Sequence, residues 1–116
     1  MIKIKRVYEQ PSTDDGYRVL VDRLWPRGVS KSKAQLDEWL KEVAPSNELR
    51  KWFHHEPEKF EAFKENYAAE LQEGSAKEAF AHLKMLVATH PIVTLVYGAK
   101  DTQDNQAVCL KEWLEQ

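Results

Sequence analysis

The apolar run Ile92–Tyr97, which lies between Pro91 and Gly98, constrains this chain more than any other segment. Its residues, Ile-Val-Thr-Leu-Val-Tyr, are almost continuously apolar and do not alternate with polar ones. A strand with one face in water alternates, whereas a strand of a parallel sheet is covered on both faces and is apolar throughout. The run therefore predicts a strand with layers of structure on both sides.

Two earlier segments also have the composition of strands. Ile2–Tyr8 alternates apolar and basic residues at its start, which suits a half-exposed strand near a sheet edge. Tyr17–Val21 is short and rich in β-branched residues, and the polar segment Glu9–Gly16 before it is expected to be a loop. That connection is short enough to leave both parallel and antiparallel pairing of these two strands open.

Five helices are expected from apolar residues at helical spacing and from capping residues. Their predicted starts are Ser32, Ser46, Pro57, Ser75 and Asp104. The first is expected to run past Val43 to Pro45, and the third to end at Gly74. The expected fold is a small layered α/β domain, with a short, mostly parallel sheet covered by about five helices.

The apolar stripes also predict the core. Phe60, Phe63, Leu83 and Val93 are expected to be largely buried. Packing is the expected role of Trp39, Trp52 and Trp113 at their helical spacings, and of Cys109 between two apolar neighbours.

Composition excludes several classes of protein. The 116 residues suit a single domain over residues 1–116, and the one cysteine excludes an internal disulfide and a multi-cysteine metal site. The formal net charge of −2 disfavours binding to nucleic acid through bulk charge. No apolar run approaches the ~20 residues of a membrane span, so a cytoplasmic protein without a membrane partner is expected. The sequence leaves the oligomeric state open.

The candidate site lies in the loops that follow two of the strands. If Tyr17–Val21 and Ile92–Tyr97 run parallel, their following loops emerge at the same sheet edge, where α/β proteins bind ligands. In the first loop, Arg23 and Arg27 supply planar donors for a phosphate or carboxylate, and Trp25 supplies an aromatic face. A small anionic ligand is therefore the expected partner.

Three residues of these loops are candidates for acid–base chemistry, namely Asp22, Lys100 and Asp101, and Asn105 is a further candidate ligand-binding residue. The alternative is structural, with the arginines paired to nearby acids to hold a long loop. An enzyme would need Asp22 or Asp101 to face a pocket beside the arginines, whereas a scaffold would hold these carboxylates in ion pairs.

No metal or cofactor is expected. His54 and His55 are adjacent, so on a helix their side chains diverge by about 100° and do not chelate one ion easily. No nucleotide-binding glycine motif and no serine-nucleophile motif is present.

Several blocks closely resemble the YeaO-like family of small bacterial proteins, whose function is unknown. These blocks are Asp22–Gly28 (Asp-Arg-Leu-Trp-Pro-Arg-Gly), Trp39–Ser46, Leu49–His54 and Leu95–Asp101 with Asn105. The resemblance covers nearly the whole chain and implies a compact α/β domain.

A wider set of similar domains carries a Cys-His-Arg triplet after the last strand. Alignment of the loops places Asn105, Gln106 and Ala107 at that triplet, so the nucleophile-like cysteine is absent here. Cys109 is displaced onto the predicted helix.

These observations predict a protein that binds an anionic, phosphate- or nucleotide-like ligand, with hydrolysis or group transfer as the enzymatic version. The alternative is a non-catalytic interaction or regulatory module, and DNA binding is less favoured.

Overall fold

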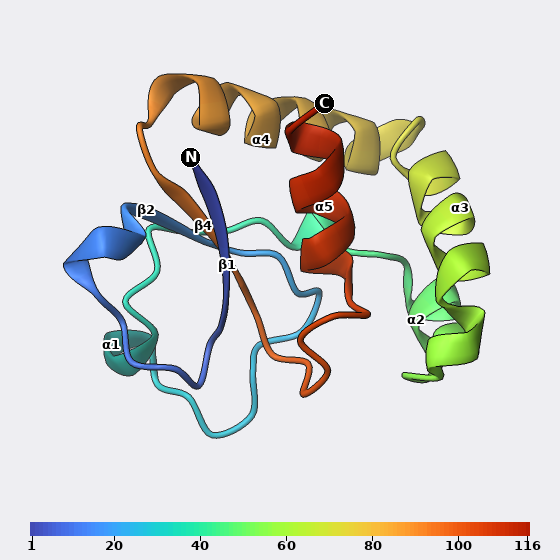
Figure 1. The fold of residues 1–116 in the computed structure, drawn as a ribbon, viewed down its shortest axis with the longest axis horizontal. Coiled ribbons are helices and arrows are strands. Elements are labelled where there is room, and N and C mark those ends of the chain that lie inside the picture. Colours follow the sequence, from blue (N-terminus) through green and yellow to red (C-terminus); the bar gives the residue numbers. More distant parts are fainter.

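A parallel sheet of four strands forms the centre of the molecule (Figure 1). The computed structural model describes residues 1–116. The strands are β1 (Ile2–Arg6), β2 (Tyr17–Leu20), β3 (Glu38–Trp39) and β4 (Val93–Tyr97). Their order across the sheet is β1-β4-β2-β3, and every neighbouring pair is parallel.

The covered strand predicted from the apolar run is β4, and all of its residues are buried. Val93 is in register with Ile2 of β1 on one side and with Tyr17 of β2 on the other. The first two strands therefore do not pair with each other, because β4 lies between them. β1 forms one edge of the sheet, as its alternation with basic residues predicted.

Five helices surround the sheet: α1 (Lys31–Ala34), α2 (Asn47–Phe53), α3 (Phe60–Glu70), α4 (Gly74–Thr89) and α5 (Gln106–Leu114). Single 3-10 turns form at Thr13–Asp15, Lys41–Val43 and Pro57–Lys59. In Figure 1, α4 runs along the end where the strands begin, α5 lies in front of the sheet, and α2 and α3 stand to one side. The predicted layered α/β fold is confirmed.

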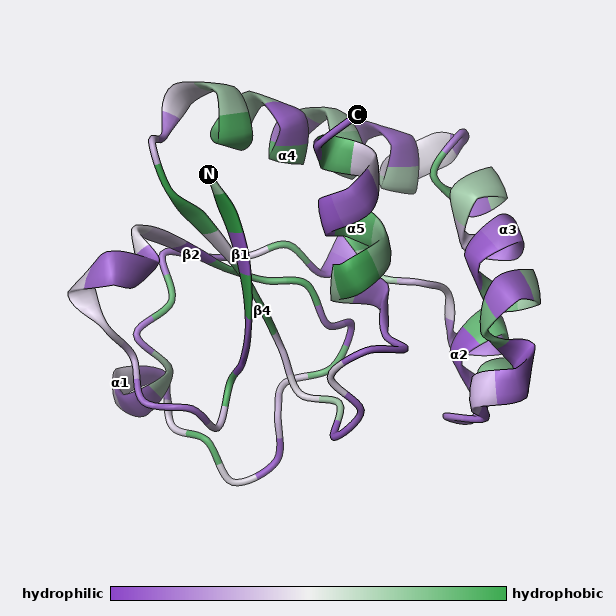
Figure 2. Cartoon of the chain, in the orientation of Figure 1, coloured by the Kyte–Doolittle hydropathy of each residue, from purple (hydrophilic) through white to green (hydrophobic).

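The two faces of the sheet contribute to separate apolar clusters. Val19 and Leu95 belong to a large cluster that the residues of α2 to α5 complete. Leu20 and Val96 point to the opposite face and pack with Ala34 of α1 in a smaller cluster. Figure 2 shows the apolar residues concentrated in the strands and on the inner sides of α4 and α5.

The predicted core is mostly confirmed. Phe63, Leu83 and Val93 are buried, and Phe60 is half-buried. Cys109 is fully buried in the large cluster.

Two tryptophans expected to pack are instead exposed, Trp39 by 36% and Trp52 by 44%. Trp113 is half-buried and packs against the large cluster.

The helix predicted from Ser32 to Val43 is wrong. α1 stops after one turn at Ala34, and Gln35 adopts a left-handed conformation with φ 46°. The chain then pairs with β2, because the backbone N–H of Asp37 donates to Arg18 O at 2.9 Å and the Asp37 carboxylate accepts from Arg18 N at 2.8 Å. Hydrogen bonding to a neighbouring strand outweighs the helical spacing of the apolar residues here.

Three predicted helix boundaries also differ from the structure. Gly74 is the first residue of α4 and does not terminate α3, which ends at Glu70. Ser75 consequently lies inside α4 and caps nothing. The last helix is capped by Asn105, whose side-chain oxygen accepts from Val108 N at 3.0 Å, and not by Asp104.

The turn before β2 packs against the start of β4. The Asp15 carboxylate accepts from Arg18 Nη1 at 2.6 Å and from Lys5 Nζ at 3.1 Å, which joins the turn to β1 and β2. Gly16 follows with φ 63°, and a Cβ atom there would lie 2.3 Å from Ile92 O. Only glycine suits both this backbone conformation and this close approach.

Candidate functional site

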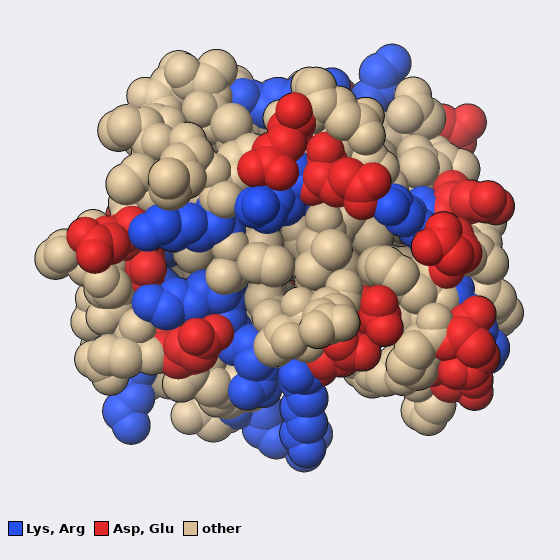
Figure 3. Space-filling model, viewed as in Figure 1, with Lys and Arg blue, Asp and Glu red and all other residues tan.

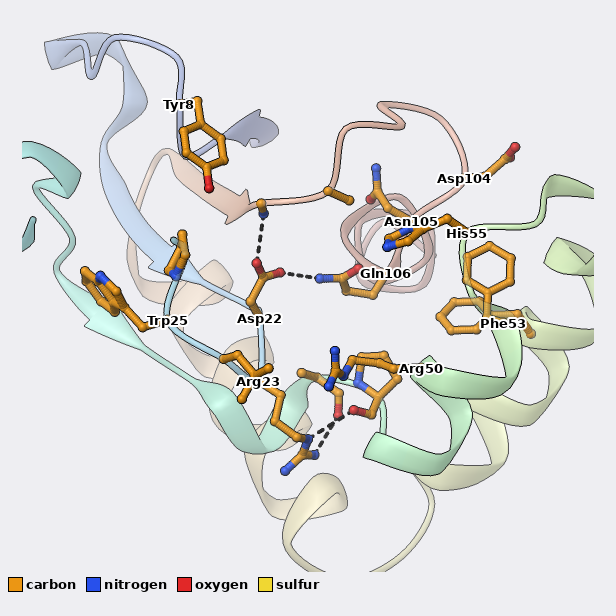
Figure 4. A pocket seen from close by; sticks show the side chains of 17 residues that line it. Tyr8, Asp22, Arg23, Trp25, Arg50, Phe53, His55, Asp104, Asn105 and Gln106 are labelled. Carbon is orange, nitrogen blue, oxygen red and sulfur yellow. Dashed lines mark hydrogen bonds between the residues drawn. The ribbon is translucent and has the colours of Figure 1, made fainter. Parts of the chain in front are cut away.

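A cavity of about 300 Å³ opens at the carboxyl ends of β2 and β4 (Figure 4). Its walls come from the loops after β2 and β4, the segment before α2, the end of α2 and the start of α5. The two loops meet because their strands are parallel neighbours, as the sequence predicted. Ligands bind at this edge in open α/β sheets, so the cavity is the candidate site.

The structure brings only part of the predicted set into this cavity. Asp22, Arg23, Trp25 and Asn105 line it. The other three residues, Arg27, Lys100 and Asp101, lie outside its lining.

Asp22 lies in the middle of the site and has no ion-pair partner within 4.0 Å. One carboxylate oxygen accepts from the backbone N–H of Gly98 at 2.8 Å, and the other accepts from Gln106 Nε2 at 2.5 Å. Burial raises the pKa of Asp22 to about 6, although both hydrogen bonds and the charge of Arg50 act in the opposite direction.

Arg23 joins two walls of the cavity. Its Nε donates to Pro45 O and its Nη2 donates to Ala44 O, both at 3.0 Å. Its Nη1 lies 3.8 Å from the Glu42 carboxylate. These bonds hold the loop after β2 against the segment that leads into α2, so much of the guanidinium already has protein partners.

Arg50 is a lining residue that the sequence analysis did not single out. It lies one turn into α2, whose start is fixed where Ser46 Oγ accepts from Leu49 N at 3.1 Å. The Glu70 carboxylate in turn accepts from the backbone N–H and the hydroxyl of Ser46. Arg50 directly follows the apolar Leu49 in the sequence. This neighbour, which places Arg50 beside the buried face of the helix, was the only feature of the sequence that could have indicated a role in the site.

The Arg50 guanidinium is incompletely bonded within the protein. Its Nη2 donates to Asn47 Oδ1 at 3.1 Å, whereas its Nε is buried and has no hydrogen-bond partner. No carboxylate lies within ion-pairing distance of Arg50. Its Nε is the only buried side-chain nitrogen or oxygen in the protein without a partner.

Asp101 and Asn105 build the loop after β4. The Asp101 carboxylate accepts from the backbone N–H groups of Gln103 and Asp104, which holds its pKa below the usual value. Asn105 caps α5 and donates from Nδ2 to Asp101 O at 2.8 Å. This arrangement fixes the start of α5, and Gln106 at its first position consequently reaches Asp22.

Aromatic side chains form the opposite walls. Trp25 Nε1 donates to Val29 O at 2.6 Å, and its ring meets the edge of Trp39 at a centroid distance of 5.4 Å. Phe53 stacks on Phe63 at 4.5 Å. In Figure 4, Trp25 and Tyr8 lie on one side of Asp22 and Phe53 lies on the other.

The lining of the cavity carries charges of both signs. Arg23 and Arg50 line it together with the carboxylates of Asp22 and Asp104, and burial raises the pKa of Asp22 to about 6 and also raises the pKa of Asp104. On the face seen in Figure 3, Lys and Arg side chains gather toward the edge where the strand-following loops lie, and acidic side chains gather over α3.

The fold and the cavity together define a small parallel α/β domain with a polar cavity at the carboxyl edge of its sheet. The chain belongs to the family described as the inactive DUF488-N3 subclade, whose model matches residues 1–116.

Curated relatives support this membership. The chain is 48% identical over 117 residues to "Uncharacterized protein YeaO" of Escherichia coli (strain K12), covering 97% of this chain and 96% of that protein. It is 41% identical over 113 residues to "Uncharacterized protein Rv3073c" of Mycobacterium tuberculosis (strain ATCC 25618 / H37Rv), covering 97% and 92%. No solved structure matches the chain. The predicted resemblance to the YeaO-like family is confirmed.

Two further findings describe the whole chain. None of its helices combines the length and the apolar character needed to cross a membrane. No three His, Cys, Asp or Glu side chains are grouped in a way that could hold a metal ion.

Proposed function

We propose that this protein binds a small anionic ligand, of the phosphate or carboxylate type, in the cavity between the loops that follow β2 and β4. The observation that carries the proposal is the Arg50 guanidinium, which lines the cavity and makes one hydrogen bond to the protein, from Nη2 to Asn47 Oδ1. A guanidinium has five N–H donors, so most of them remain for the oxygen atoms of a ligand. Guanidinium groups bind phosphate and carboxylate through paired hydrogen bonds, which makes an anion the matching ligand.

The family description favours a protein that binds a ligand without catalysing a reaction, because it calls the subclade inactive. In addition, Asn105 and Gln106 occupy the region where similar domains carry a cysteine, and Asn105 caps a helix while Gln106 bonds to Asp22. The one cysteine, Cys109, is buried, and burial raises its pKa to about 12, so it is no nucleophile at neutral pH.

Hydrolysis or group transfer is a second candidate, and Asp22 is the observation that favours it. Asp22 faces the cavity beside two arginines and is free of ion pairs, which is the arrangement that an enzyme requires. Its pKa of about 6 is close to the working range of a general acid or base. Hydrolysis of a bound ester by the wild type, together with its loss in the Asp22→Asn variant, would establish this second function.

Titration calorimetry with inorganic phosphate tests the binding proposal. Arg50→Gln removes the charge and the planar donors, and it should weaken binding at least tenfold, because a charged hydrogen bond contributes about 1.5–3 kcal/mol. Lys51→Gln is the matched control, since it removes the same charge from the next residue of α2, which is exposed. It should leave the affinity within about twofold, since exposed charges interact weakly.

Equal weakening in both variants would show attraction by bulk charge only and would refute the proposed site. Absence of phosphate binding to the wild type would refute it as well. Arg27→Gln, measured in the same series, tests the contribution that the sequence predicted for this exposed arginine.

A further inference from the structure

We infer that the ligand is a phosphate ester of a vicinal diol, whose phosphate lies at Arg50 and whose hydroxyl groups donate to Asp22 and Gln106. This inference rests on the proposed function and names the class of ligand that the same cavity takes.

The part of the cavity formed by Asp22 and Gln106 offers acceptors and almost no donors. The Gly98 N–H and the Gln106 Nε2 both already donate to the Asp22 carboxylate. A carboxylate has about four lone-pair sites, so about two remain unused on Asp22. Gln106 Oε1 accepts no hydrogen bond from the protein either. A ligand group at this position therefore has to donate.

An anionic group does not fit against these acceptors, because it would face a carboxylate and bring no hydrogen. The anion consequently belongs beside Arg50, whose guanidinium lines the cavity and makes one hydrogen bond to the protein. In Figure 4, Arg50 lies below the Asp22–Gln106 pair, next to Phe53. The ligand is thus two-ended, with an acidic group and a separate donating group.

Hydroxyl groups match the donating end better than an ammonium group does. Arg23 and Arg50 both line the cavity near Asp22, and a third cation there would be repelled by two guanidinium groups. A neutral hydroxyl avoids this repulsion. The acceptor atoms also belong to two neighbouring side chains, which are joined by the hydrogen bond from Gln106 Nε2 to Asp22 Oδ1. Two adjacent hydroxyl groups on one carbon chain suit such neighbouring acceptors.

The remaining walls suit the carbon skeleton of such a ligand. Trp25, Tyr8 and Phe53 present aromatic surface to a cavity of about 300 Å³, the lower end of the usual range for ligand pockets. Either a sugar phosphate or a nucleoside monophosphate supplies this chemistry, since both carry a phosphate ester and a vicinal diol.

Calorimetry with paired ligands tests the inference. Ribose 5-phosphate and adenosine 5′-monophosphate are each compared with the 2-deoxy form, which lacks one hydroxyl of the diol, and with inorganic phosphate. We expect each ribo form to bind about tenfold tighter than its deoxy form, as the loss of a hydrogen bond to a partly buried, charged partner predicts. The ribo form that binds more tightly shows whether the ligand is a sugar phosphate or a nucleoside monophosphate.

Two variants separate the two ends of the ligand. Gln106→Met keeps the approximate size of the side chain but removes its acceptor, and it should reduce the preference for ribo over deoxy forms while phosphate still binds. Arg50→Gln should weaken every phosphate-bearing ligand, and Lys51→Gln should weaken none.

Equal binding of ribo and deoxy forms to the wild type would overturn the inference. Phosphate binding that still depends on Arg50 would, in that case, leave the proposed function intact. Tighter binding of a zwitterion such as L-glutamate would also overturn it, because an ammonium group would then occupy the Asp22 end. Failure of all these ligands to bind would remove the proposed function together with the inference.

Discussion

Asp22→Asn tests the energetics of the half-buried carboxylate at the centre of the site. Burial raises the pKa of Asp22 from 3.8 to about 6 in the folded protein. If the pKa of Asp22 in the unfolded chain keeps the ordinary value of 3.8, the native state binds the proton of this carboxyl more tightly than the unfolded state does. The stabilisation is complete below the unfolded pKa and is lost as the pH rises through the folded pKa.

The size of this effect follows from the pKa shift. Each unit corresponds to 1.36 kcal/mol, so the shift contributes about 3 kcal/mol in total, of which about 2 kcal/mol lies between pH 4.5 and 7.5. The asparagine amide has nearly the same shape and does not titrate. Its oxygen can still accept from the Gly98 N–H, and the Gln106 amide can turn to accept from its NH₂ group.

Urea unfolding of both proteins at pH 4.5, 6.0 and 7.5, followed by circular dichroism, measures the difference. Other carboxylates affect both proteins alike and cancel when one free energy of unfolding is subtracted from the other. The variant should gain about 2 kcal/mol relative to the wild type as the pH rises from 4.5 to 7.5. A difference that does not change with pH, or a wild type that gains on the variant, would refute this account of Asp22.

Three further predictions concern the fold. Phe63→Ala removes a buried ring stacked on Phe53 and should lower the free energy of unfolding by about 3–5 kcal/mol in urea titrations; a cost near zero would contradict the packing described. Cys109, with its pKa raised to about 12, should react with a thiol reagent at pH 8 only after the protein unfolds, and rapid labelling of the native state would show that it is accessible. Gly16→Ala should lower the midpoint of thermal unfolding because its Cβ would meet Ile92 O, whereas Gly28→Ala, where no atom lies within 4 Å of the added Cβ, serves as a control that carries only the strain of positive φ.

The sequence was most informative where burial dictates composition. The run that forms β4 had to be apolar on both faces, so it could be recognised without any knowledge of its neighbours. By contrast, the spacing of Leu36, Trp39, Leu40 and Val43 suits a helix, yet Trp39 lies in the two-residue strand β3, Val43 lies in a 3-10 turn, and the two leucines lie in neither. The deciding hydrogen bonds come from Arg18, which is distant along the chain, and no local pattern records them.

The candidate site divides in the same way. A topological rule placed the loops after β2 and β4 at one edge, and Asp22 and Trp25 consequently line the cavity. Arg50 escaped prediction because it comes from α2, which follows no long strand. Its position depends on the bonds of Arg23 to the Ala44 and Pro45 carbonyls, contacts between side chain and backbone that leave no periodic signature.

The central position of β4 has a consequence for how the chain assembles during synthesis. β4 is the last strand to leave the ribosome, yet β1 pairs only with it, and without it β2 has only the two-residue strand β3 as a partner. Local helices can form early, but the long-range pairing of strands has to wait for almost the entire chain. Until then, the edges of β1 and β2 are open to association with other nascent chains. The nascent protein is therefore most exposed to aggregation in the interval just before its last fifth emerges.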